Sequence, residues 1–133
     1  MSMYVRPVGI KEAEIAVPVD LQYKRKDSRT LYSGTVTASG NTTDIDLSDF
    51  SAVELEFKVT AVSGTNPTLD IYFEGKFEAT GDWKTLASQT GITSTGIWFL
   101  TVDPLVFRYI RVRWVVGGTS PSFTFTVAAQ LMV

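Results

Sequence analysis

Apolar and polar residues alternate along most of this chain. The clearest runs are residues 53–61 (VELEFKVTA) and residues 107–116 (FRYIRVRWVV). Successive side chains of a strand point to opposite faces, so these runs predict strands with one face in a core and the other in water. Similar runs recur at residues 31–38, 43–47, 52–62, 68–77, 83–88, 96–102 and 122–132.

Turn-forming residues separate these runs. Residues 63–67 (SGTNP) and 117–121 (GGTSP) hold the densest turn chemistry and predict tight connections between separate strands. Eight or nine strands at this spacing predict an all-β fold, an antiparallel β-sandwich of the jelly-roll type.

The alternation also assigns a core, because shifting a strand by one residue would expose its whole apolar set. Trp114 is predicted to be the largest side chain inside the sandwich. The predicted core residues are Leu55, Phe57, Val59, Leu69, Ile71, Phe73, Ile110, Val112, Trp114, Phe123 and Phe125.

Residues 1–30 break the pattern and are predicted to form an N-terminal arm or edge segment, with a single sandwich domain over residues 31–133. The arm carries a net charge of +2 in a chain of net charge −2, so the remainder carries −4. Its apolar residues need burial, either on their own domain or on a neighbouring copy. They are Ile10, Ile15, Val17, Val19 and Leu21.

Composition narrows the function. The chain has no histidine and no cysteine, which removes the usual general base, thiol nucleophile and soft metal ligands. We therefore expect a protein that is not an enzyme and has no cofactor. A pI near 5.0 gives no basis for nucleic-acid binding. No apolar run approaches the roughly 20 residues that span a bilayer, and the N-terminus does not resemble a secretory signal, so no membrane association is expected.

Acidic residues and aromatic residues each allow two interpretations. Asp44, Asp46 and Asp49 have a spacing that offers oxygen ligands to calcium, or they keep a sheet edge solvated. A second acidic set is expected on outward faces, where it lacks the cleft that a glycosidase needs; it comprises Glu54, Glu56, Asp70 and Glu74. A sugar-stacking platform or ordinary core packing would each account for Tyr72, Trp83 and Trp98.

Two basic groups are candidates for protein–protein contact. Lys24, Arg25, Lys26 and Arg29 form a cluster that either touches an acidic neighbour or lies in a solvated loop. Tyr109, Arg111 and Arg113 share the wet face of one predicted strand and form the preferred contact strip, because interfaces favour Arg and Tyr.

Several phrases over residues 31–133 resemble a known group of proteins. They are residues 60–72 (TAVSGTNPTLDIY), 83–86 (WKTL), 109–114 (YIRVRW) and 117–125 (GGTSPSFTF). Together they resemble the small β-sandwich virion structural proteins of tailed bacteriophages and prophages, which decorate heads or belong to tails and necks.

The resemblance implies a non-enzymatic virion protein that is made in the host cytoplasm. It also implies binding to other virion proteins and to copies of itself, as a homo-oligomer or a repeated copy. The alternative is a carbohydrate-binding or host-adhesion module of similar architecture, which fold analogy alone does not exclude.

Overall fold

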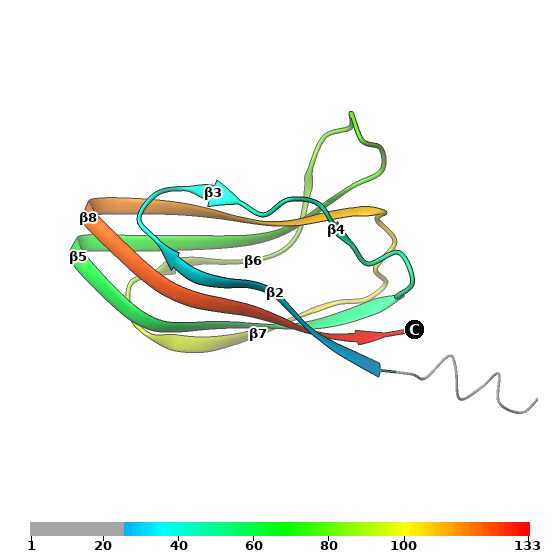
Figure 1. Ribbon diagram of the computed structural model, residues 1–133, viewed down its shortest axis with the longest axis horizontal. Helices are drawn as coiled ribbons and strands as arrows, with labels where there is room; N and C mark the ends of the chain where they lie inside the picture. Colours follow the sequence, from blue (N-terminus) through cyan, green and yellow to red (C-terminus); the bar gives the residue numbers. More distant parts are fainter. Residues whose placement is uncertain (1–25) are drawn as a thin grey trace, which may run out of the picture.

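The computed structural model describes residues 26–133, which form seven strands and no helix. These residues accordingly contain no helix of the length and apolarity needed to cross a membrane. Two strands are far longer than the others, and both lie in the middle of the fold (Figure 1). The strands are β2 (Lys26–Val36), β3 (Gly40–Asn41), β4 (Ile45–Asp46), β5 (Ala52–Lys76), β6 (Lys84–Ile92), β7 (Gly96–Val102) and β8 (Tyr109–Met132).

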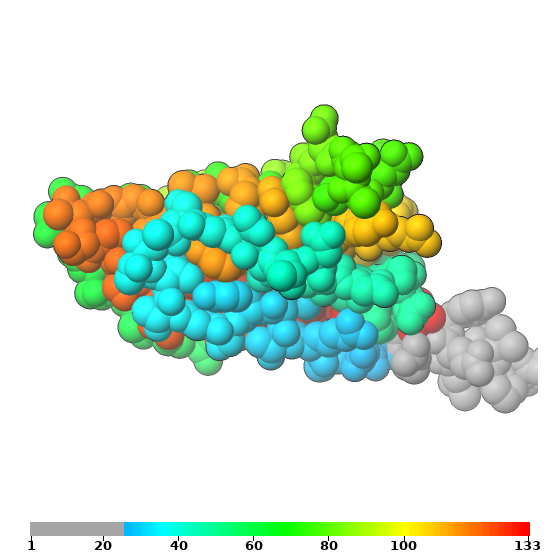
Figure 2. All heavy atoms as spheres, turned by 45° about the horizontal axis from the view of Figure 1, so that its top comes forward, coloured from blue at the N-terminus to red at the C-terminus, as the bar shows by residue number. Residues whose placement is uncertain are grey.

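The long strands β5 and β8 run antiparallel along nearly their whole length and bend together at the left end of Figure 1. Each therefore contributes one half to each of two layers. The first layer has the order β2-β8-β5-β7, and in the second β3 and β4 pair with β8 while β6 pairs with β5. In Figure 2 the blue-to-cyan residues of β2 and β3 lie beside the orange residues of β8. This continuous sheet, folded over on itself, is the antiparallel jelly-roll sandwich that the sequence predicts.

The two bends correct one expectation. Residues 63–67 and 117–121 were predicted to join separate strands, but each lies inside a continuous strand. The two corners share a pattern, GTNP at residues 64–67 and GTSP at 118–121. Their backbones match too: φ is +111° at Gly64 and +108° at Gly118, and the residue before each proline has φ near +50°.

The corners also fit into each other. Thr65 pairs with Thr119 at the centre of the bend. A Cβ added to Gly64 would lie 2.6 Å from the carbonyl oxygen of Ser120, and a Cβ added to Gly118 would lie 2.6 Å from that of Asn66. Each glycine thus supplies both the positive φ and the space that the opposite corner occupies.

The core lies between the two layers, and all eleven predicted core residues are buried. Trp114 is 7% exposed, and its Nε1 donates a hydrogen bond of 3.1 Å to the carbonyl oxygen of Ala38. Its ring centroid lies 4.5 Å from that of Tyr32 and 5.8 Å from that of Phe125. The prediction that Trp114 is the large core aromatic is confirmed.

The limits of several strands differ from the sequence prediction. β2 begins at Lys26 rather than Leu31, so Lys26 and Arg29 belong to a strand and not to a loop. β2 continues across these charged residues because, within residues 26–133, it pairs only with β8, and edge strands tolerate charged side chains that reach water. The predicted strand at residues 43–47 is reduced to the two residues of β4, whereas β6 extends past Ser88 to Ile92.

Candidate interaction surface

Tyr109, Arg111 and Arg113 follow one another on the outer face of β8, as the alternation predicts. All three are half-buried, while Ile110 and Val112 between them point into the core. The register places Arg111 beside Glu74 and Arg113 beside Tyr72 on β5. The strip is therefore part of a larger outer face formed by β8 and β5.

Glu74 is the residue that organises this face. Its Oε1 accepts a hydrogen bond of 2.8 Å from the Nε of Arg111, and its Oε2 lies 3.1 Å from nitrogens of Arg113. Glu74 is 4% exposed, whereas the two arginine side chains are 20% and 32% exposed. The expectation of a solvated Glu74 was wrong, because the arginines lie over the carboxylate and shield it from water.

The cations of this face also make cation–π contacts with neighbouring aromatic rings. The guanidinium of Arg113 lies 4.1 Å from the ring centroid of Tyr72, and that of Arg111 lies 4.3 Å from the ring of Trp83. The ammonium of Lys76 also lies 4.4 Å from the Trp83 ring. Cation–π contacts of this kind hold long side chains in fixed positions.

We call this set of six side chains the arginine–aromatic surface: Tyr72, Glu74, Lys76, Trp83, Arg111 and Arg113. Its three cations exceed its one carboxylate, so it carries a net charge of +2 within an acidic chain. Arg111 uses only its Nε in the hydrogen bond to Glu74. The face can therefore receive carboxylates of a partner with arginines already in position, which mainly favours correct orientation and fast association.

The three aromatic residues of the possible sugar platform do not form a single surface. Trp98 lies on β7 in the other layer and packs against the core. Tyr72 and Trp83 do share the outer face, but cations already cover their rings. The aromatic residues therefore position charge here instead of presenting a bare stacking face.

The basic cluster divides between described and undescribed residues. Lys24 and Arg25 lie outside the described residues. Arg29 lies 3.7 Å from Asp27, donates a hydrogen bond to the carbonyl oxygen of Asp46 and sits over the ring of Phe50. Lys26 is exposed at the start of β2, so the structure does not join this cluster to the arginine–aromatic surface.

Asp44, Asp46 and Asp49, the candidate calcium ligands, are exposed and do not form a cluster. Asp46 accepts hydrogen bonds from the hydroxyl and the backbone amide of Ser48, and these bonds lower the pKa of its carboxyl. Asp44 and Asp49 are also exposed. Over residues 26–133 no three acidic side chains come together in a way that could hold a metal ion.

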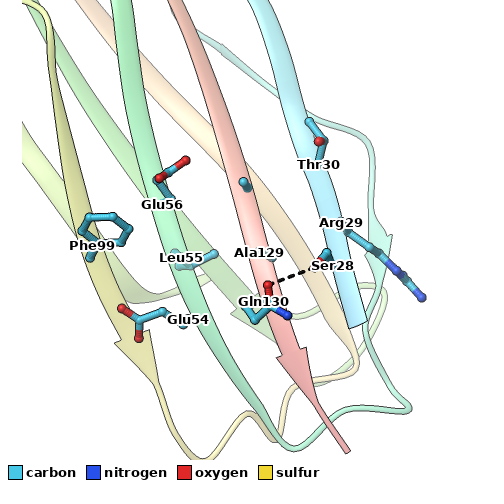
Figure 3. A pocket seen from close by; sticks show the side chains of 10 residues that line it. Ser28, Arg29, Thr30, Glu54, Leu55, Glu56, Phe99, Ala129 and Gln130 are labelled. Carbon is cyan, nitrogen blue, oxygen red and sulfur yellow. Dashed lines mark hydrogen bonds between the residues drawn. The ribbon is translucent and has the colours of Figure 1, made fainter. Parts of the chain in front are cut away.

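A hollow of about 390 Å³, which no sequence pattern predicts, lies on the outer face of the other layer (Figure 3). Phe99 on β7 stands on one side and Thr30 on β2 on the other, with Glu56 and Ala128 between them in the same cross-strand row. The small side chain of Ala128 makes the hollow. Pairing register, which alternation does not reveal, brings these residues together.

Comparisons with known proteins place the fold. No protein-family model and no curated protein matches the chain. The structure is similar to that of the SPBc2 prophage-derived protein YomS, with a TM-score of 0.54 and 13% identity over 92% of this chain and 100% of that one. It is also similar to a subunit from Bacillus endospore appendages, with a TM-score of 0.50 and 15% identity over 82% and 88% of the two chains. At these identities the likeness shows the shared jelly-roll fold.

Proposed function

We propose that this chain is a non-enzymatic structural protein of a tailed bacteriophage or prophage, present in the virion in many copies. The observation that carries the proposal is the end-to-end likeness to a protein of prophage origin. The second neighbour comes from endospore appendages that form disulfide-linked pili, which is also an assembled structure. The phrases that resemble phage virion proteins lie in the same described region.

The contact surfaces support the proposal independently. The arginine–aromatic surface has preset cations and no bare aromatic face, which suits an acidic protein surface better than a neutral sugar. Within the virion, the chain would bind copies of itself and other virion proteins, and so decorate or stabilise the capsid or join the neck or tail.

The presence of the chain in particles tests this function. Particles would be induced from a strain that carries the gene, banded on a density gradient and analysed by mass spectrometry. We expect the chain to band with the major capsid protein, at a copy number well above one per particle. A chain found only in the soluble fraction, beside host cytoplasmic proteins, would contradict the proposal.

Assembly of the purified protein tests the repeated-copy part. Light scattering of the full chain should give a mass that is a multiple of 14.6 kDa. Deleting residues 1–22 should lower that mass while circular dichroism still reports a folded β-protein. A truncated chain that stays folded and keeps the full-length mass would show that the arm has no part in assembly.

A further inference from the structure

Two large apolar side chains lie unpartnered beside the hollow. Ile97 and Phe99 are 50% and 63% exposed and stand on the same outer side of β7. β7 is an edge strand, paired only with β5 among the described residues. Exposed apolar side chains that adjoin a hollow mark an interaction site more strongly than the same residues scattered singly.

The hollow has a definite shape and charge. Phe99 forms one wall, Ser28 and Thr30 form the other, and Glu54 and Glu56 project from β5 between them (Figure 3). The side chain of Glu54 is engaged by the hydroxyl of Thr101. A volume of about 390 Å³ is near the low end of the roughly 300–1,000 Å³ of ligand pockets, so it suits side chains of an extended segment.

We propose that residues 15–21 of a neighbouring copy lie in this hollow as an extended segment. Its sequence, IAVPVDL, places Ile15, Val17, Val19 and Leu21 in one row at period two. Pro18 falls on the opposite row, so its ring does not enter the hollow, and a segment that docks through its apolar side chains does not need the N–H that proline lacks. In this arrangement the apolar row covers Ile97 and Phe99, the two exposed apolar side chains of β7.

Charge fits the same arrangement. Lys24 and Arg25 follow the apolar row after two intervening residues, and Glu54 and Glu56 line the hollow that receives it. Arg29 also lines the hollow, but its guanidinium is occupied by Asp27 and by the carbonyl oxygen of Asp46. The basic residues of the arm thus meet carboxylates at the end of the docked segment.

The sequence before β2 favours a neighbour over the same chain. To enter its own hollow, the arm would have to reverse direction immediately before Lys26, where β2 begins. Residues 21–26 (LQYKRK) contain no Gly, Pro, Asn, Asp or Ser, the residues on which tight reversals depend. Without such a reversal an extended arm would point away from its own sheet, and 25 residues would reach at most about 80 Å.

Cysteine cross-linking of the full chain tests this inference, which rests on the proposed assembly from repeated copies. The chain has no cysteine, so every disulfide formed reports an introduced pair. A chain with Val17→Cys and a differently tagged chain with Ile97→Cys would be co-produced and mildly oxidised. We expect a disulfide-linked heterodimer, at least about fivefold more abundant than with the control Val106→Cys, because a disulfide needs its Cβ atoms close together. Val106 is a demanding control, since it is 66% exposed and Ile97 is 50% exposed.

Two results of the cross-linking experiment would overturn the inference. A chain carrying both Val17→Cys and Ile97→Cys that closes only an internal disulfide would show that the arm packs on its own subunit, and would overturn the inference. Heterodimer no more abundant than with the Val106→Cys control would overturn it as well. Light scattering of the unmodified chain distinguishes failure of this docking arrangement from failure of the proposed function. If the copies associate but the cross-link does not form, only the docking of residues 15–21 is wrong. If the chain is strictly monomeric, the proposed assembly from repeated copies is wrong as well.

Discussion

The carboxylate of Glu74 lies 2.8 Å from the Nε of Arg111 on the neighbouring strand and is almost completely removed from water. A carboxylate on the outer face of a sheet is normally solvated. Here the arginine side chains, themselves held over Trp83 and Tyr72, form a lid over it. The charge at this face is therefore fixed in place before any partner arrives.

Replacing this carboxylate is expected to destabilise the fold. Glu74→Gln keeps the shape but removes the charge that two arginines share, and should cost about 2 kcal/mol of unfolding free energy, since the arginines are partly exposed. Urea unfolding followed by circular dichroism measures it. Glu56→Gln, on the outer face of the same strand and without an ion pair among the described residues, should change stability by less than about 0.5 kcal/mol. Equal effects of the two changes would contradict the role given to Glu74.

Truncating the central tryptophan is expected to cost more. Trp114→Ala removes a buried ring and the donor to Ala38, and should cost about 3–5 kcal/mol. Trp83→Ala, which removes a half-buried ring on the outer face, should cost clearly less. The same urea titration compares them, and a larger loss for Trp83→Ala would mean that the core is centred elsewhere.

The interlocked corners give a third prediction. Gly64→Ala and Gly118→Ala each force a Cβ against backbone of the opposite corner at a positive φ, so both should lower stability by roughly 3 kcal/mol or more. Gly91→Ala is the matched control, because Gly91 also has a positive φ (+69°) but open space around its Cβ position. Its loss should be near 1 kcal/mol. Similar losses at all three sites would mean that backbone strain alone matters and that the fit between corners does not.

Asp46 gives a prediction for pH. Hydrogen bonds from Ser48 lower the pKa of this carboxyl in the folded state below its ordinary value. The folded state therefore favours the charged form, and the stabilisation is present above the unfolded pKa and lost as pH falls through the folded pKa. Asp46→Asn should lower the melting temperature slightly at pH 7, and the difference from the unchanged chain should shrink as pH falls through the folded pKa. A difference that grows on acidification would contradict this assignment.

Much of the fold could be predicted from the sequence, because alternation reports the facing of each residue directly. The inward rows on β5 and β8, from Leu55 to Phe125, follow from parity alone. Parity does not report which strand lies beside which. It could not show that Glu74 would meet Arg111, or that Ala128 would lie between Glu56 and Thr30, since both depend on register.

The predicted ends of several strands were wrong for a related physical reason. Turn residues at 63–67 and 117–121 are read locally as places where a strand ends, but a strand can pass through such residues when its partner bends with it. The charged start of β2 was misassigned because an edge strand tolerates charge that a central strand would not.

The paired corners also bear on how the molecule comes apart. Both layers are made from the same two strands, β5 and β8. The bend of each strand fills the space that the glycine in the other bend leaves open. Melting one layer alone would have to break the fit at both corners and leave the facing apolar rows of the second layer open to water. The sandwich should consequently lose its structure in one cooperative step, with amide protons in β5 and β8 exchanging at a common, slow rate on either side of the bend.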